Sequence, residues 1–204
     1  MEPEGRWIWA LNAKACSTSI KVLISGCPVG QAHTTLRTGL FEPEEFTKRF
    51  SFVVVRNPWD RLVSAWASKI PLVVLRKDLR NMGCTPYMPF DEFVRVVCET
   101  KVCKQDNHMK PQGVQIPDVG CVCRFESIEA DWEAVRASTG LGELPRHGAS
   151  RHEDPDKYKT PELVQMVAEY YKADYERFGY LIPDGVPELD SDRGNVGAVE
   201  LAAL

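Results

Sequence analysis

The sequence predicts an α/β fold in which a central parallel sheet is flanked by helices. Its 204 residues, of which 44% are hydrophobic, suffice for one domain with a good core. Predicted strands alternate with predicted helices along the chain, which is typical of a parallel sheet. The run Phe52-Val-Val-Val55 is apolar at every position, as expected of a central strand covered on both faces.

The first part of the chain begins with a strand over residues 6–11, rich in tryptophan and isoleucine. A short helix follows over residues 17–25, and Gly26 ends it. Residues 29–42 are expected to form a connection, and residues 43–49 a short helical turn. These elements lead into the apolar strand.

The helix after that strand has a clear beginning. Asn57 is suited to cap it, and Pro58 fits its first position. The apolar side chains that follow recur at helical spacing and define a core face: Trp59, Leu62, Val63 and Trp66.

The sequence patterns that predict the remaining elements are weaker. Residues 70–89 are mixed, and residues 101–120 form a long polar loop of the kind that is often functional. Helices are expected over 91–99, from a Ser127 cap to about residue 139, and from Thr160-Pro161 to about residue 178; a strand is expected over 121–125. The folded domain is assigned to residues 1–183, and the acidic tail 184–204 is expected to be disordered.

Charge and cysteine content exclude several classes of protein. The net charge is −4, and there is no basic stripe, so a nucleic-acid partner is not expected. Residues 14–64 nevertheless hold seven basic and four acidic side chains, so this region is locally positive. Seven cysteines, an odd number, indicate reduced and mostly buried thiols rather than a disulfide framework. With no signal peptide and no membrane-length apolar run, a cytoplasmic protein without a membrane partner is expected.

Two segments are predicted to bind anions. Lys14-Ala-Cys-Ser-Thr-Ser19 joins the first strand to a helix N-terminus, where backbone N–H groups, a lysine and hydroxyls favour an anion. Arg56 stands at the carboxyl end of the central strand beside the next helix N-terminus. Two such sites on one sheet suggest a ligand with two separated phosphate-like groups.

The first segment does not match two better-known phosphate loops. The glycines of the nucleotide-triphosphatase pattern are absent, and the lysine precedes the hydroxyl run. A phosphatase-type loop would need an arginine six residues after Cys16, where the chain has Val22. Cys16 is therefore not expected to be a nucleophile.

Five segments, in order, resemble the carbohydrate-type sulfotransferases. Lys14 to Ile20 is similar to their 5′-phosphosulfate loop, and Val55-Arg-Asn-Pro-Trp-Asp-Arg-Leu-Val-Ser-Ala65 to their 3′-phosphate motif. Asp106-Asn-His-Met-Lys-Pro-Gln112, Arg124-Phe-Glu126 and the segment 170–180 resemble later landmarks of the family.

The resemblance implies a P-loop-like three-layer sandwich and a donor, 3′-phosphoadenosine 5′-phosphosulfate (PAPS), whose product is adenosine 3′,5′-bisphosphate (PAP). It implies that Lys14 and the loop residues Ala15, Cys16, Ser17, Thr18 and Ser19 hold the 5′-phosphosulfate, and that Arg56 and Ser64 hold the 3′-phosphate. Lys14 would also be catalytic, stabilising charge on the leaving phosphate. No metal is implied, because the protein supplies the positive field.

A hydroxyl acceptor needs a general base, and histidine suits neutral pH. His33, between the two anion sites, is the preferred candidate, and it matches where some family members carry their base. His108 is the second candidate, with Asp106 placed to orient its ring. Arg61 is expected to be structural, as are the two tryptophans of the core face.

The acceptor is left open between a glycan and a small molecule, and between a hydroxyl and an amine. Two other functions also stay open. A P-loop small-molecule kinase would depend on magnesium, and a non-catalytic nucleotide-binding module would bind the bisphosphate without turnover.

Overall fold

A computed structural model describes residues 7–35, 42–146 and 154–182. Within these ranges, a small parallel sheet contains three strands in the order of the sequence: β1 (Trp7–Ala10), β2 (Phe50–Val55) and β3 (Cys121–Arg124). Ala10 lies opposite Val53, and Val55 lies opposite Arg124. Because the strands are parallel, their carboxyl ends meet at one edge of the sheet.

One face of the sheet packs against α1 (Ser17–Ser25) and α8 (Ile128–Thr139). Phe52 forms the centre of this contact, and its ring meets the ring of Trp132 edge-on at 5.7 Å between centroids. Burial of large aromatic side chains supplies most of the free energy of such a contact.

The other face packs against α3 (Pro43–Lys48) and α10 (Lys172–Phe178). Phe46 and Phe178 cover Val53 and Val55 from these two helices. β2 is therefore enclosed on both faces, and its last five residues are buried. The apolar run predicted this burial. The mixed α/β character and the parallel sheet are confirmed, whereas the P-loop-like sandwich stays a prediction.

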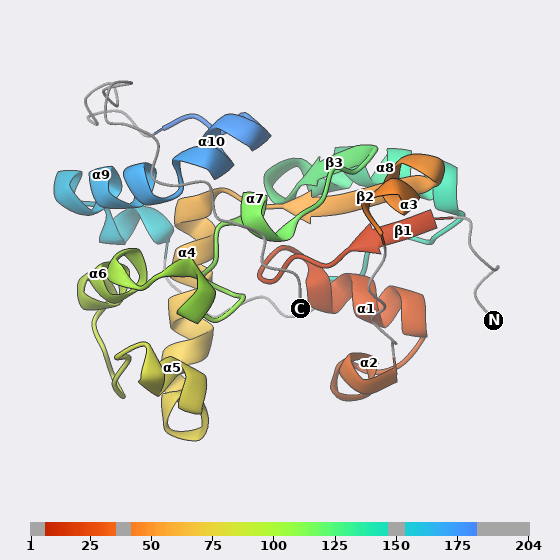
Figure 1. The fold of residues 1–204 in the computed structure, drawn as a ribbon. Helices are drawn as coiled ribbons and strands as arrows, with labels where there is room; N and C mark the ends of the chain where they lie inside the picture. The colour runs from red at the N-terminus through yellow and green to blue at the C-terminus, as the bar shows by residue number, and fades with distance from the viewer. Residues whose placement is uncertain (1–6, 36–41, 147–153, 183–204) are drawn as a thin grey trace.

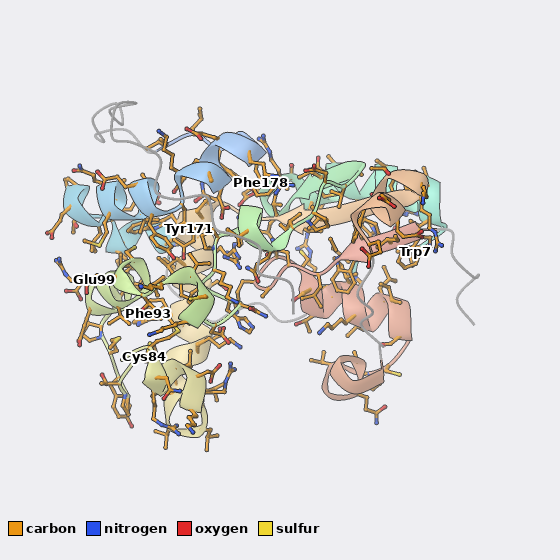
Figure 2. The ribbon with its side chains drawn as sticks, in the orientation of Figure 1. Trp7, Cys84, Phe93, Glu99, Tyr171 and Phe178 are labelled. Atoms are coloured by element: carbon orange, nitrogen blue, oxygen red, sulfur yellow. The ribbon has the colours of Figure 1, made fainter. Side chains whose placement is uncertain are left out.

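A second core, formed mainly by helices, lies beside the sheet (Figure 1). Its central helix is α4 (Pro58–Lys69), which begins where Asn57 Oδ1 accepts a hydrogen bond of 3.0 Å from Trp59 N. Around it lie η1 (Ile70–Leu75), α5 (Lys77–Asn81), α6 (Phe90–Glu99) and α9 (Pro161–Tyr170). Figure 2 shows Phe93 and Tyr171 among these helices, far from Trp7 in the sheet.

The core face predicted for α4 is confirmed. Trp59 is 1% exposed, and the rings of Trp59 and Trp66 both meet Phe90 edge-on, at 5.5 and 5.6 Å. Both indole N–H groups donate to backbone carbonyls, those of Pro155 and Met88. The tryptophans are thus core residues with satisfied polar atoms.

Several predicted loops contain short elements. The connection 29–42 contains α2 (Val29–Thr35), and the segment 101–120 contains η2 (Val102–Lys104) and α7 (Gln112–Gln115). Two further single turns are η3 (Phe125–Ser127) and η4 (Pro155–Tyr158). These turns depend on tertiary contacts rather than on hydrophobic periodicity, so the sequence gives little sign of them.

Two predictions for the later helices need correction. The single helix expected up to residue 178 is broken at Tyr171, a buried residue whose hydroxyl donates to Met109 O at 2.5 Å. Ser127 occupies the position before α8, but its hydroxyl bonds the Asp131 carboxylate instead of capping the helix. The tail 184–204 lies outside the described residues. No helix within the described ranges is long and apolar enough to cross a membrane.

Candidate functional site

The loop between β1 and α1 has an unusual backbone. Lys14 and Cys16 adopt positive φ angles of 69° and 54°, a left-handed conformation that glycine usually occupies. Each such residue costs about 1–2 kcal/mol, and conformations of this kind cluster at ligand sites. Cys16 occupies the N-cap position of α1 without a side-chain cap, so the first N–H groups of α1 have no acceptor in their own helix. The segment therefore has the backbone character of an anion-binding turn.

The Lys14 side chain lies at the centre of a cluster of positive charges. Its ammonium donates to Ser68 Oγ at 2.9 Å. Burial lowers its pKa to about 8, and repulsion by Lys69, Arg56 and Arg61 adds to this effect. Such repulsion would be relieved by a bound anion, which is the electrostatic property expected of a phosphate site.

Arg56 reaches this cluster from the end of β2. Its Nη1 lies 3.4 Å from Lys14 O, and its guanidinium carbon lies 4.3 Å from the centre of the Phe125 ring. The buried Nε has no hydrogen-bond partner among the described residues. An orphaned donor of this kind on a half-buried cation is suited to an anionic ligand.

A structural ion pair does not account for Arg56. Among the described residues, no carboxylate lies within 4.0 Å of its guanidinium, although Asp60 and Glu126 are near enough to favour its charge. Glu126 instead accepts hydrogen bonds from Asn57 N at 2.7 Å and from the Tyr180 hydroxyl at 3.0 Å. The expected anion site at Arg56 thus has the free capacity that it requires.

His108 approaches the same cluster from the long loop. Its Nδ1 lies 2.5 Å from Asp106 Oδ1, and its backbone N–H donates to the same oxygen at 2.9 Å. Because a carboxylate can only accept, this contact places the ring proton on Nδ1 and leaves Nε2 with its lone pair. Burial lowers the pKa of His108, and the positive charges of Lys69 and Lys14 add to this effect against the pull of Asp106. The lowered pKa favours the neutral ring, whose Nε2 can accept a proton.

Asp106 is held in its charged form. Burial opposes its ionisation, but the hydrogen bonds from His108 and the charge of Arg76 keep its pKa well below the ordinary value. Its second oxygen accepts from Arg76 Nη2 at 2.7 Å, and Arg76 also pairs with Asp78. A fixed carboxylate of this kind orients an imidazole and stabilises its protonated form.

The other predicted residues are placed less completely. His33 lies on α2, but its side chain is outside the described part of the structure, so its role as a base stays a prediction. Ser64 lies on α4 two turns after Arg56 and is 1% exposed. Its predicted contact with a 3′-phosphate also stays a prediction.

Arg61 was expected to be structural, and its contacts agree with that role. The guanidinium is 1% exposed and donates to Ala13 O at 3.0 Å, Lys110 O at 2.8 Å and Asn107 O at 3.1 Å. It thereby ties the loop that carries Lys14 to the loop that carries His108.

The segments 124–126 and 170–180, which resemble later landmarks of the family, contact each other beside β3. Arg124 donates to Phe178 O at 2.8 Å and to Gly179 O at 3.2 Å, and its guanidinium lies over the Tyr180 ring. Gly179 has a φ of 63°, and a β-carbon there would lie only 2.9 Å from the Arg124 side chain. These residues hold the end of α10 against the sheet edge.

All seven cysteines are free, and they differ in exposure. Cys84 and Cys123 are buried as expected, whereas Cys103 is exposed. Burial raises the pKa of the Cys16 thiol to about 11, so this side chain is neutral and a poor nucleophile at pH 7. In the part of the chain that the structure describes, no three His, Cys, Asp or Glu side chains are placed to hold a metal ion.

Comparison with known proteins identifies the family. The model of the Sulfotransferase family matches residues 30–181, which include Arg56, His108 and both late landmarks. The Lys14 loop precedes the matched segment, so its assignment depends on its geometry. No curated protein and no solved structure gives a significant match to the chain. Because the family model covers well over half of its length, the chain belongs to the carbohydrate-type sulfotransferase family.

Proposed function

We propose that the protein transfers a sulfuryl group from PAPS to a hydroxyl or amine of a glycan or small-molecule acceptor. Membership of a sulfotransferase family supports the reaction class. The proposal includes a P-loop-like three-layer sandwich as the scaffold, because both faces of the described sheet carry helices.

The observation that carries the proposal is the convergence of two cations at one edge of the sheet. Lys14 and Arg56 follow the parallel strands β1 and β2, and the Arg56 guanidinium reaches the backbone of Lys14. One cation adjoins a helix N-terminus, and the other has an unused buried donor. Such a pair suits a ligand with two separated anionic groups.

In the proposed complex, Lys14 and residues 15–19 hold the 5′-phosphosulfate, and Arg56 with Ser64 holds the 3′-phosphate. The donor supplies the sulfuryl group, and PAP is the leaving group. Lys14 stabilises the negative charge that grows on the phosphate oxygen. The cationic side chains supply the positive field, so the proposal assigns no role to a metal.

We assign the general base to His108, because its ring and its backbone N–H both contact the Asp106 carboxylate, which can orient the imidazole. Its Nε2 takes the acceptor proton, while Asp106 stabilises the resulting imidazolium through Nδ1. His33 is kept as the alternative base. His33→Ala and His108→Ala distinguish the two, since loss of the true base abolishes transfer to a hydroxyl without loss of bisphosphate binding.

The proposal is tested by ligand binding followed by turnover. We expect PAP to raise the melting temperature in the presence of EDTA, and ATP with or without magnesium to have a much smaller effect. Incubation with labelled PAPS and a panel of glycan and small-molecule acceptors should then give a sulfated product. Preference for magnesium-ATP would indicate a kinase, and PAP binding without turnover on any acceptor would indicate a binding module.

A further inference from the structure

Gln112 is a completely buried glutamine at the beginning of α7, with an exposed fraction of 0%. Its side-chain amide makes two hydrogen bonds with the backbone of Arg56. Arg56 N donates to Gln112 Oε1 at 3.0 Å, and Gln112 Nε2 donates to Arg56 O at 2.8 Å.

This pair of bonds takes the place of strand-to-strand hydrogen bonds at Arg56. β2 ends at Val55, so Arg56 is the first residue beyond the ladder of the sheet. A residue in a sheet interior would exchange N–H and C=O bonds with a neighbouring backbone. At Arg56 the primary amide of Gln112 supplies both partners, and it thereby fixes the peptide from which the Arg56 side chain extends.

The same amide also fixes the end of β1. Asn12 Nδ2 donates to Gln112 Oε1 at 2.7 Å and to Val54 O at 2.9 Å, and Asn12 is 2% exposed. Asn12 immediately precedes the loop that carries Lys14. One buried amide therefore connects the backbones that carry the two predicted anion-binding side chains.

Gln112 is itself held in place by Asp174. This carboxylate is completely buried and accepts hydrogen bonds from Gln112 N and Gly113 N, both at 2.7 Å. A β-carbon at Gly113 would lie 3.2 Å from Asp174 Oδ1, so the carboxylate approaches this backbone closely and leaves little room for a side chain. The amide thus has a rigid support, as a positioning group needs.

We infer that Gln112 is a positioning residue for recognition of the 3′-phosphate, acting through the backbone of Arg56. This inference rests on the proposed function, because it takes PAP as the ligand of the site. It also has a consequence for the reaction. Gln112 ends the loop that begins with Asp106 and His108, so the base and the donor site share one support.

The test measures how much the 3′-phosphate contributes to binding. This contribution is the ratio of the dissociation constant of adenosine 5′-monophosphate to that of PAP, both obtained by titration calorimetry. We expect Gln112→Leu to lower this ratio by about tenfold, since the two hydrogen bonds that fix Arg56 are together worth at least roughly that factor. Affinity for the monophosphate should change by less than about twofold, because Asn12 keeps its bond to Val54 O and still holds the start of the loop that carries Lys14.

A double-mutant cycle separates positioning from general damage. In an Arg56→Ala background the 3′-phosphate has lost the charged partner through which Gln112 acts, so Gln112→Leu should no longer change the ratio. The matched control is Gln105→Leu. Gln105 is another buried glutamine, and its amide bonds Val97 O, Thr100 O and the Tyr170 hydroxyl, away from the sheet edge. This variant should lose stability but keep the ratio.

The outcomes are distinguishable. A folded Gln112→Leu protein with the wild-type ratio would overturn the inference, as would an equal loss of affinity for both ligands. If Gln112→Leu does not fold, Gln112→Asn gives the same test, because it keeps the amide but is one methylene too short to reach both Arg56 atoms. A wild-type protein that binds PAP no better than the monophosphate would instead refute the proposed function.

Discussion

Replacement of Asp106 by asparagine tests the proposed base without removing it. The two side chains have nearly the same shape, but asparagine has no charge and only one acceptor atom. In the structure one oxygen of Asp106 faces His108 Nδ1 at 2.5 Å, and the other faces Arg76 Nη2 at 2.7 Å. An asparagine has only one oxygen to accept with. Its NH2 group must therefore face either His108 Nδ1–H or Arg76 Nη2, and two hydrogen-bond donors then meet.

The size of the effect follows from these contacts. If the amide oxygen turns to Arg76, the amide N–H faces Nδ1 and shifts the ring proton to Nε2, which cannot then act as a base. A hydrogen bond to a charged group is worth about 1.5–3 kcal/mol, so kcat should fall by about 10- to 100-fold. The carboxylate also favours the charged form of the ring. Its removal therefore lowers the pKa of His108 further and moves the acidic limb of the pH profile to lower pH.

The assay is the pH dependence of kcat for a hydroxyl acceptor, with PAP affinity measured in parallel. PAP affinity should change by less than about twofold, because the two Asp106 oxygens face His108 and Arg76, and neither of these residues is assigned to donor binding. Asp78→Asn is the matched control, since Asp78 pairs with Arg76 from an exposed position and does not contact His108. A variant Asp106→Asn with the wild-type kcat and an unmoved acidic limb would refute the role of His108 as base.

Three further predictions concern stability, charge and the thiol. Arg61→Met removes three hydrogen bonds from the guanidinium and takes away the donor to Ala13 O, whereas Lys110 O and Asn107 O keep Gln115 Nε2, so unfolding in urea should show a loss of about 2 kcal/mol or more, and a loss below about 1 kcal/mol would contradict the structural role. Lys14 has a pKa of about 8, so kcat/KM should fall as the pH rises through that value, and Lys14→Ala should remove this limb while it lowers kcat more than donor affinity. Because the Cys16 thiol is neutral, Cys16→Ser should keep kcat within about threefold in the sulfation assay, and a loss above about 100-fold would indicate covalent chemistry.

The elements nearest the site could be predicted because their signals are local. The apolar run of β2, the Asn57-Pro58 beginning of α4 and the glycine that ends α1 each follow from one or two residues. The short turns α2 and α7 were missed because they have no apolar periodicity. The break at Tyr171 was missed because apolar residues continue at helical spacing on both sides of it, and no local pattern marks an end there.

The candidate site could be predicted only in part, because some of its features depend on contacts between segments that are distant in the sequence. Lys14 and Arg56 were found because each follows a strand, and parallel strands bring their carboxyl ends together. The left-handed backbone at Lys14 and Cys16 was not foreseen, since sequence patterns associate that conformation with glycine. The roles of Gln112 and Asn12 are also absent from local patterns, because each depends on hydrogen bonds across distant segments.

The central claim is that two cations at adjoining strand ends grip the two phosphate groups of one nucleotide. The most direct measurement is calorimetric titration of PAP and of adenosine 5′-monophosphate into the wild-type protein, Lys14→Ala and Arg56→Ala. Arg56→Ala should weaken PAP binding alone by at least about tenfold, whereas Lys14→Ala should weaken binding of both nucleotides by the same factor. If Arg56→Ala weakened both nucleotides equally, or if neither variant changed PAP affinity, the two cations would not bind the two phosphate groups of one nucleotide.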